Sequence, residues 1–179
     1  MKRLTIYRTC RHNSVYGTLK RESAYQLFLR TKDLRKNMGA ANLIIASHIP
    51  EAMNSAKIIQ LAMDNNIRII SCPRLSRYHA GRCRAFKEMF LAHIKDSFSH
   101  YDHIILVSHN IIISELTNKG VAEGNYLCIE ADSWKNIFDF SANRLTFPVS
   151  QLKVTASNAI SETQNQDKLL LNSLQLFAD

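Results

Sequence analysis

The sequence predicts a three-layer α/β/α sandwich, in which a mainly parallel sheet carries helices on both faces. Three observations lead to this fold class. Short apolar segments of strand length alternate along the chain with longer segments of helical periodicity, the pattern of parallel α/β folds. Residues 103–108 form a continuous apolar run, which is typical of a strand covered on both faces. The length of 179 residues suits one domain with a sizeable core.

The predicted strands are short apolar segments, bounded by polar or turn-forming residues. They are expected at residues 4–7, 42–46, 67–71, 103–108, 126–130 and 136–140. Alternation with helices then requires crossover connections, so most neighbouring strands should run parallel.

The predicted helices carry apolar residues at a spacing that places them on one face. They are expected at residues 22–37, 51–65 and 84–97, with a short helix after residue 108. In the first, Ala24, Leu27 and Phe28 share a face with Leu34. Pro50 stands where the first turn of the second helix tolerates proline. The segment 72–81 is expected to be irregular.

The chain divides into three parts by composition. Residues 1–154 are expected to form the domain, and residues 155–167 are polar, as in a linker. Residues 168–179 form an apolar C-terminal tail that we expect to be helical. The stretch from Leu169 to Phe177 would dock on its own domain or form a contact with a partner, such as a homodimer.

Composition restricts the partners and the compartment. The formal charge of +8 favours anionic partners, either a phosphorylated small molecule or an acidic protein face. A nucleic-acid-binding module is kept as an alternative, although no aromatic and basic stacking pattern or recognition helix supports it. No apolar stretch approaches the roughly 20 residues that span a bilayer, so no membrane association is expected. Four cysteines without a C-x-x-C pair indicate reduced thiols and a cytoplasmic location.

Several familiar site signatures are absent from the sequence. Five glycines leave no G-x-G-x-x-G or Walker A loop, and there is no G-x-S-x-G elbow. His100 and His103 stand close together but lack further metal ligands at a sensible spacing. We therefore expect neither a cofactor nor a metal.

Three segments, taken together, carry a recognisable pattern. They are residues 4–10 (LTIYRTC), 44–56 (IIASHIPEAMNSA) and 104–110 (IILVSHN). Their order and spacing resemble the histidine phosphatase, or phosphoglycerate-mutase-like, superfamily. That family has an opening strand ending in R-H-G, a strand leading into S-P-L-x-R-A-x-Q-T-A, and a later strand ending in S-H-G. The resemblance covers about residues 3–154.

The resemblance implies a chemistry of phosphoryl transfer. In the family, the histidine of the first motif attacks phosphorus and becomes phosphohistidine. Two arginines and the second histidine hold the phosphoryl oxygens, and an acid protonates the leaving oxygen. This is nucleophilic catalysis combined with fixed positive charge around the transferring group. The carboxyl ends of parallel strands suit such a pocket.

The match at the catalytic positions is incomplete. Arg8 falls on the first arginine and His109 on the second histidine. Thr9, however, falls on the nucleophile, and Glu51 on the second arginine. Arg77, in the segment 75–81, falls on a position that is often acidic. The other candidate ligand-binding residues are His48, beside the proposed pocket, and Asn110, in place of the last glycine.

A second alignment of the first motif stays open, because Arg11-His12-Asn13 also spells R-H-x. It makes His12 the nucleophile, but it requires the opening strand to run through Cys10 and to bury Arg8, which is expensive without a partner. The first alignment, with the strand ending directly before Arg8, is favoured.

These observations predict a phosphatase-like domain with lost or strongly altered catalysis that binds a phospho-ligand or a protein partner in a regulatory role. The alternative is an active phosphomonoesterase that uses His12 and His109. Two catalytic positions invert their charge, so we also expect Glu51 and Arg77 to approach each other and form an ion pair at the pocket mouth.

Overall fold

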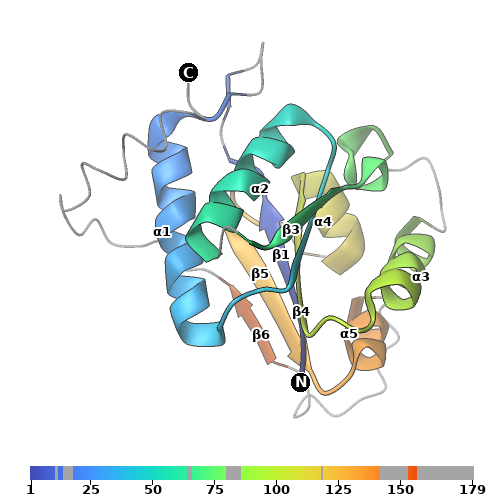
Figure 1. The fold of residues 1–179 in the computed structure, drawn as a ribbon. Helices are drawn as coiled ribbons and strands as arrows, with labels where there is room; N and C mark the ends of the chain where they lie inside the picture. The colour runs from blue at the N-terminus through green and yellow to red at the C-terminus, as the bar shows by residue number, and fades with distance from the viewer. Residues whose placement is uncertain are drawn as a thin grey trace.

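The computed structural model describes residues 1–10, 12–13, 18–63, 66–79, 86–117, 119–141 and 153–156. Within them, a six-stranded sheet has the order β3-β2-β4-β1-β5-β6, with helices on both of its faces (Figure 1). The predicted three-layer α/β/α architecture is confirmed.

The sheet is mainly parallel, as the alternating pattern predicted. Its strands are β1 (Lys2–Arg8), β2 (Leu43–Ala46), β3 (Arg68–Ser71), β4 (His103–Ser108), β5 (Tyr126–Ala131) and β6 (Lys153–Ala156). The pairs β1–β4, β2–β4 and β2–β3 are parallel, whereas β5 runs antiparallel to β1 and to β6. Four neighbouring strands therefore end at the same edge.

Helices α1 (Arg21–Met38) and α2 (Pro50–Met63) cover one face of the sheet, and α3 (Phe86–Phe98), α4 (Asn110–Thr117) and α5 (Trp134–Ser141) belong to the other layer (Figure 1). Alternate residues of the strands point to opposite faces. In β4, Ile105 and Val107 join the core beneath α1 and α2, while Ile104 and Leu106 join the core on the other side. This double burial explains why β4 is apolar throughout.

One predicted strand is wrong, because residues 136–140 lie inside helix α5. The Ser133 hydroxyl accepts a hydrogen bond from the Asn136 amide at 3.3 Å, which caps the helix start. Trp134 and Ile137, three residues apart, are both buried against the sheet. The buried residues of this segment therefore recur with a helical spacing, which the five residues 136–140 were too few to reveal.

The last strand of the sheet is β6, which the sequence did not predict, and it includes the first two residues of the expected linker over 155–167. The remainder of that segment and the apolar tail over 168–179 lie outside the described residues, so the docking of Leu169 to Phe177 stays a prediction. Residues 72–79 of the expected irregular segment contain two short 3-10 turns, Pro73–Leu75 and Arg77–His79.

Among the described residues, no helix has the length and apolar character that crossing a membrane requires. Three described cysteines, Cys10, Cys72 and Cys128, are not in disulfide bonds.

Candidate functional site

The carboxyl ends of β1, β4 and β2 lie side by side at one edge of the sheet. Arg8 pairs in register with Ser108, so Thr9 and His109 leave the sheet together. The Thr9 amide donates a hydrogen bond to the Ser108 carbonyl at 2.9 Å. On the other side of β4, Ser47 follows the end of β2. This is the edge at which parallel α/β folds place their ligands.

Glu51 enters the site from the first turn of α2. The Ser47 hydroxyl accepts a hydrogen bond from the Ile49 amide at 3.4 Å, just before the helix begins. The Ser55 hydroxyl donates to the Glu51 carbonyl at 2.7 Å and accepts from the Cys10 amide at 3.3 Å. The helix start is thereby tied to the segment that follows β1.

Arg77 is brought to the site by the loop after β3. The Cys72 amide donates a hydrogen bond to the Ala46 carbonyl at 2.7 Å, which holds the start of this loop against β2. The Ser108 hydroxyl donates to the Leu75 carbonyl at 2.6 Å, and the Leu75 side chain is completely buried. Ser108, the last residue of β4, therefore holds the loop that places Arg77 near Glu51.

One oxygen of the Glu51 carboxylate is the centre of the site. Glu51 Oε1 lies 3.6 Å from Arg77 Nη1, 3.8 Å from His12 Nε2 and 3.9 Å from His109 Nδ1. The Glu51 side chain is only 4% exposed, whereas that of Arg77 is 46% exposed. We call these four residues the Glu51 cluster.

The predicted approach of Glu51 and Arg77 is confirmed by their separation of 3.6 Å. A carboxylate near a helix N-terminus is also favoured by the helix dipole. That effect alone would suit an exposed side chain, yet Glu51 is buried and its Oε1 makes no hydrogen bond among the described residues. The three basic groups are therefore its main electrostatic partners.

His109 is buried between Ser47 and Glu51. Its Nε2 lies 3.3 Å from the Ser47 hydroxyl, and its Nδ1 faces the Glu51 carboxylate. Burial lowers the pKa of His109 to about 4, against the opposing effect of Glu51 and with smaller contributions from the charges of Arg77, His12 and His48. His109 is consequently neutral at pH 7.

His12 also reaches the Glu51 cluster, although the strand boundary follows the favoured alignment, since β1 ends at Arg8. Its Nδ1 lies 3.4 Å from the Cys10 carbonyl. A proton on Nδ1 can be donated to that carbonyl, while Nε2 faces the Glu51 carboxylate. The Glu51 cluster thus contains His12, the nucleophile of the second alignment, although β1 ends where the first alignment expects.

Arg8 has different neighbours from the Glu51 cluster. Its Nη1 donates a hydrogen bond to the Val121 carbonyl at 3.0 Å, and its Nη2 pairs with Glu123 Oε1 at 3.3 Å. Arg8 is not among the charged groups that shift the pKa of His109. The arginine that the resemblance assigned to phosphate binding is therefore engaged by the loop before β5.

Thr9 and Cys10 are both buried directly after β1. The Thr9 backbone contacts Ser108 and Gly124, and the Cys10 thiol donates to the Ser23 carbonyl at 3.4 Å. Burial raises the pKa of Cys10 to about 12, so its thiol stays protonated and serves as a packing group.

The two remaining candidates lie at the border of the site. His48 is exposed, and its charge acts on His109. Asn110 opens α4, and its side-chain oxygen accepts a hydrogen bond from the Val121 amide at 3.1 Å. In place of a family glycine, Asn110 thus fastens the loop that also holds Arg8.

In the part of the chain that the structure describes, no group of three or more His, Cys, Asp or Glu side chains has the arrangement of a metal site. The Glu51 carboxylate is paired with the Arg77 guanidinium, and imidazole nitrogens of His12 and His109 lie 3.8 and 3.9 Å from it.

Comparison with protein-family models and with curated proteins gives no match. Solved structures give clear matches of fold. A candidate phosphohistidine phosphatase SixA from Nakamurella multipartitia has a TM-score of 0.62 at 11% identity, covering 89% of this chain and 97% of that chain. The protein histidine phosphatase SixA complexed with tungstate has a TM-score of 0.57 at 12% identity, covering 75% and 99%.

The alpha-ribazole phosphatase from Shigella flexneri is also similar, with a TM-score of 0.53 at 16% identity, covering 74% of this chain and 92% of that chain. At such low identity the likeness establishes the fold. This chain has the fold of the histidine phosphatases, as the three sequence segments implied.

Sequence reasoning missed the residues that organise the site. Ser108 fastens the Arg77 loop, Ser55 joins α2 to the end of β1, and Glu123 holds Arg8. Serines leave little signal in a single sequence, because their hydroxyls serve caps and turns in many settings. Glu123 lies far from any motif, so only the fold brings it to Arg8.

Proposed function

We propose that this chain is a histidine-phosphatase-like domain with lost or strongly altered catalysis, which binds a phosphorylated ligand or a protein partner in a regulatory role. The observation that carries the proposal is the position of Glu51 Oε1, within 3.6 to 3.9 Å of one guanidinium and two imidazole nitrogens. A carboxylate oxygen there engages the groups that would otherwise be available to a phosphoryl oxygen.

The charges of the cluster support a weak affinity for phosphate. Arg77 and Glu51 compensate each other, and His109 is neutral at pH 7 because burial lowers its pKa to about 4. These three residues together offer a phosphate dianion no net positive charge. Loss of one fixed donor in an oxyanion site typically costs about 3–4 kcal/mol of transition-state stabilisation. A carboxylate in the site lowers the affinity for a phosphoryl group further, because the two negative charges repel each other.

The decisive experiment combines turnover and oxyanion binding. We expect negligible hydrolysis of p-nitrophenyl phosphate by the wild-type protein and no acid-labile phosphoryl-enzyme. In calorimetric titrations with tungstate, Glu51→Gln should bind at least about tenfold more tightly than wild type, a gain of about 1.4 kcal/mol. Asp96→Asn, which removes an exposed carboxylate on α3, is the matched control and should leave the affinity unchanged.

Robust turnover by the wild type, abolished by His12→Ala, would contradict the proposal. Equal tungstate affinities in wild type and Glu51→Gln would show that the carboxylate does not compete with an oxyanion.

A second candidate function is an active phosphomonoesterase, and the geometry of His12 favours it. The Cys10 carbonyl 3.4 Å from Nδ1 favours the tautomer with a lone pair on Nε2, as a nucleophile requires. Arg77 would then hold the phosphoryl group and Glu51 would serve as the acid, with their family positions exchanged. A phosphoryl-enzyme that is stable in alkali, labile in acid and absent from His12→Ala would establish this function in place of the first.

A further inference from the structure

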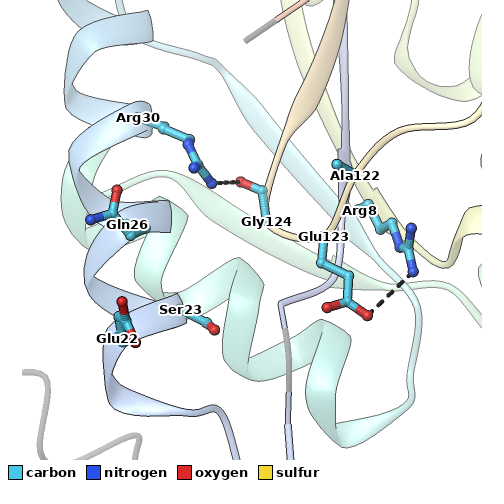
Figure 2. A pocket seen from close by; sticks show the side chains of 8 residues that line it. All are labelled: Arg8, Glu22, Ser23, Gln26, Arg30, Ala122, Glu123 and Gly124. Carbon is cyan, nitrogen blue, oxygen red and sulfur yellow. Dashed lines mark hydrogen bonds and ion pairs between the residues drawn. The ribbon is translucent and has the colours of Figure 1, made fainter. Parts of the chain in front are cut away.

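A cavity that no residue of the Glu51 cluster lines lies between the first half of α1 and the loop that precedes β5 (Figure 2). Its volume is about 610 Å³, within the range of small-molecule sites. The lining residues are Arg8, Glu22, Ser23, Gln26, Arg30, Ala122, Glu123 and Gly124. None of them belongs to the Glu51 cluster.

Helix α1 supplies a polar wall to this cavity. Glu22, Gln26 and Arg30 follow one another at intervals of four residues, so they lie on one face of the helix (Figure 2). The adjacent face, with Leu27 and Phe28, is buried in the core. The polar row lies beside this buried face and lines the cavity.

The opposite wall is held in place by Gly124. Its amide donates to the Arg8 carbonyl at 3.2 Å, and its carbonyl accepts from Arg30 Nη1 at 3.3 Å. Its φ of +67° is a conformation that glycine adopts without strain, and an added Cβ would lie 3.1 Å from Cys10 Sγ. The close approach of this loop to α1 thus depends on glycine.

The charges around the cavity are balanced, with two guanidinium and two carboxylate groups. Arg8 and Glu123 pair with each other at 3.3 Å (Figure 2). Among the described residues, Arg30 makes one hydrogen bond, from Nη1 to the Gly124 carbonyl, and Glu22 makes none. Glu22 and Arg30, two turns of α1 apart, can therefore form further hydrogen bonds to a ligand.

We propose that this cavity binds a zwitterionic peptide of about three residues, with its carboxylate on Arg30 and its ammonium group on Glu22. A guanidinium suits a carboxylate because its N–H groups match both oxygens. Eight residues of helix separate the two side chains by about 12 Å along the axis. The termini of an extended tripeptide stand about 10 Å apart, so one molecule reaches both.

The interior of the wall suits the peptide backbone. Gln26 lies between the two charged residues and offers both an amide donor and an acceptor to a peptide group. Because the lining carries no net charge, a phosphate dianion finds no electrostatic attraction here. The specificity of this cavity therefore differs from that of a phosphatase pocket. The proposal holds whether or not the Glu51 cluster is catalytically active.

The test is a calorimetric titration of the full chain with trialanine, N-acetyl-trialanine and trialanine amide. Trialanine should bind, and each capped peptide should bind at least tenfold more weakly, because each lacks one charge. Glu22→Gln should weaken trialanine at least fivefold without affecting the acetylated peptide, and Arg30→Gln should do the same without affecting the amide. Glu88→Gln and Arg35→Gln, which alter exposed charges on α3 and α1, are the matched controls.

No saturable binding at millimolar trialanine, or equal binding of the three peptides, would overturn the proposal. Arg30 contributes a hydrogen bond to the fold, so the exposed Glu22 variant provides a test that leaves this bond in place. Glu51→Gln should leave trialanine binding unchanged, and inorganic phosphate should not displace the peptide. Weaker binding by Glu51→Gln, or displacement by phosphate, would place the peptide in the Glu51 cluster instead.

Discussion

Replacing either member of the Glu51–Arg77 pair should have unequal consequences for stability. Arg77→Gln leaves a carboxylate that is 4% exposed without its guanidinium, beside a neutral His109. Glu51→Gln leaves an arginine that is 46% exposed and can extend into water. We therefore predict that loss of the more exposed residue destabilises the protein more than loss of the buried one.

The expected magnitude follows from the separation and the exposure. At 3.6 Å, two unit charges attract by about 5 kcal/mol at an effective dielectric constant of about 20. Water around the half-exposed arginine screens much of this, since exposed pairs contribute about 0–1 kcal/mol. Breaking a fully buried pair costs about 3–5 kcal/mol. Between these limits, Arg77→Gln should cost about 1–2 kcal/mol and Glu51→Gln less than about 0.5 kcal/mol.

The assay is urea denaturation of wild type, both single variants and the double variant at neutral pH. The matched control is Arg74→Gln, an exposed arginine in the same loop, three residues earlier. The double variant should be about as stable as Glu51→Gln alone, because Arg77 no longer has a charge to compensate. The cycle then gives a coupling free energy of about 1–2 kcal/mol.

Additivity within about 0.3 kcal/mol would show that the Glu51 and Arg77 side chains are not coupled. The same conclusion follows if Arg77→Gln and Arg74→Gln prove equally stable, because the buried carboxylate would then need no guanidinium. In that case Glu51 would be explained by the α2 dipole alone.

Two further predictions concern acid stability and the loop before β5. Because burial lowers the pKa of His109 from 6.5 to about 4, the unfolded chain binds more protons than the folded protein between these values, so stability should fall as pH falls from 6.5 towards 4. For one proton, the free energy of unfolding falls by at most about 1.4 kcal/mol per pH unit. Urea denaturation should show that this free energy falls less steeply with pH in His109→Gln than in the wild type. An equal dependence on pH would contradict the pKa shift of His109. Gly124→Ala should lower the melting temperature more than Gly120→Ala in the same loop, since only Gly124 of these two has a positive φ, and a Cβ there would lie 3.1 Å from Cys10 Sγ, whereas at Gly120 it would lie 3.5 Å from Asn110 Oδ1. Each strained φ costs about 1 kcal/mol, and equal melting temperatures would mean that the loop moves away from Cys10.

The order of the elements was accessible from the sequence because it depends on local patterns. The continuous apolar run of β4 and the periodic faces of α1 and α2 were assigned to the correct structure. Failure came at residues 136–140, where a five-residue window contains too little of a helical repeat to separate it from a strand. Strand β6 pairs only at the sheet edge, and its four residues carry no strong pattern.

The resemblance to the family led us to expect inverted charges at Glu51, in the second segment, and at Arg77, in the segment 75–81. Their approach could be expected because two opposite changes of sign at one pocket tend to compensate. The separation of 3.6 Å and the deep burial of Glu51 depend on how Ser55 and Ser108 fasten α2 and the Arg77 loop to the strands. Those hydrogen bonds join positions tens of residues apart.

Local patterns in the sequence were sufficient to predict the layered fold, because periodicity and motif spacing are local properties. The contacts of the long side chains were not predictable in this way: His12 lies near Glu51, whereas Arg8 pairs with Glu123 and lines the cavity beside α1. The physical reason is that long side chains at a strand end have several partners within reach. Which partner they take depends on loops, such as that before β5, whose position is set by contacts across the whole fold.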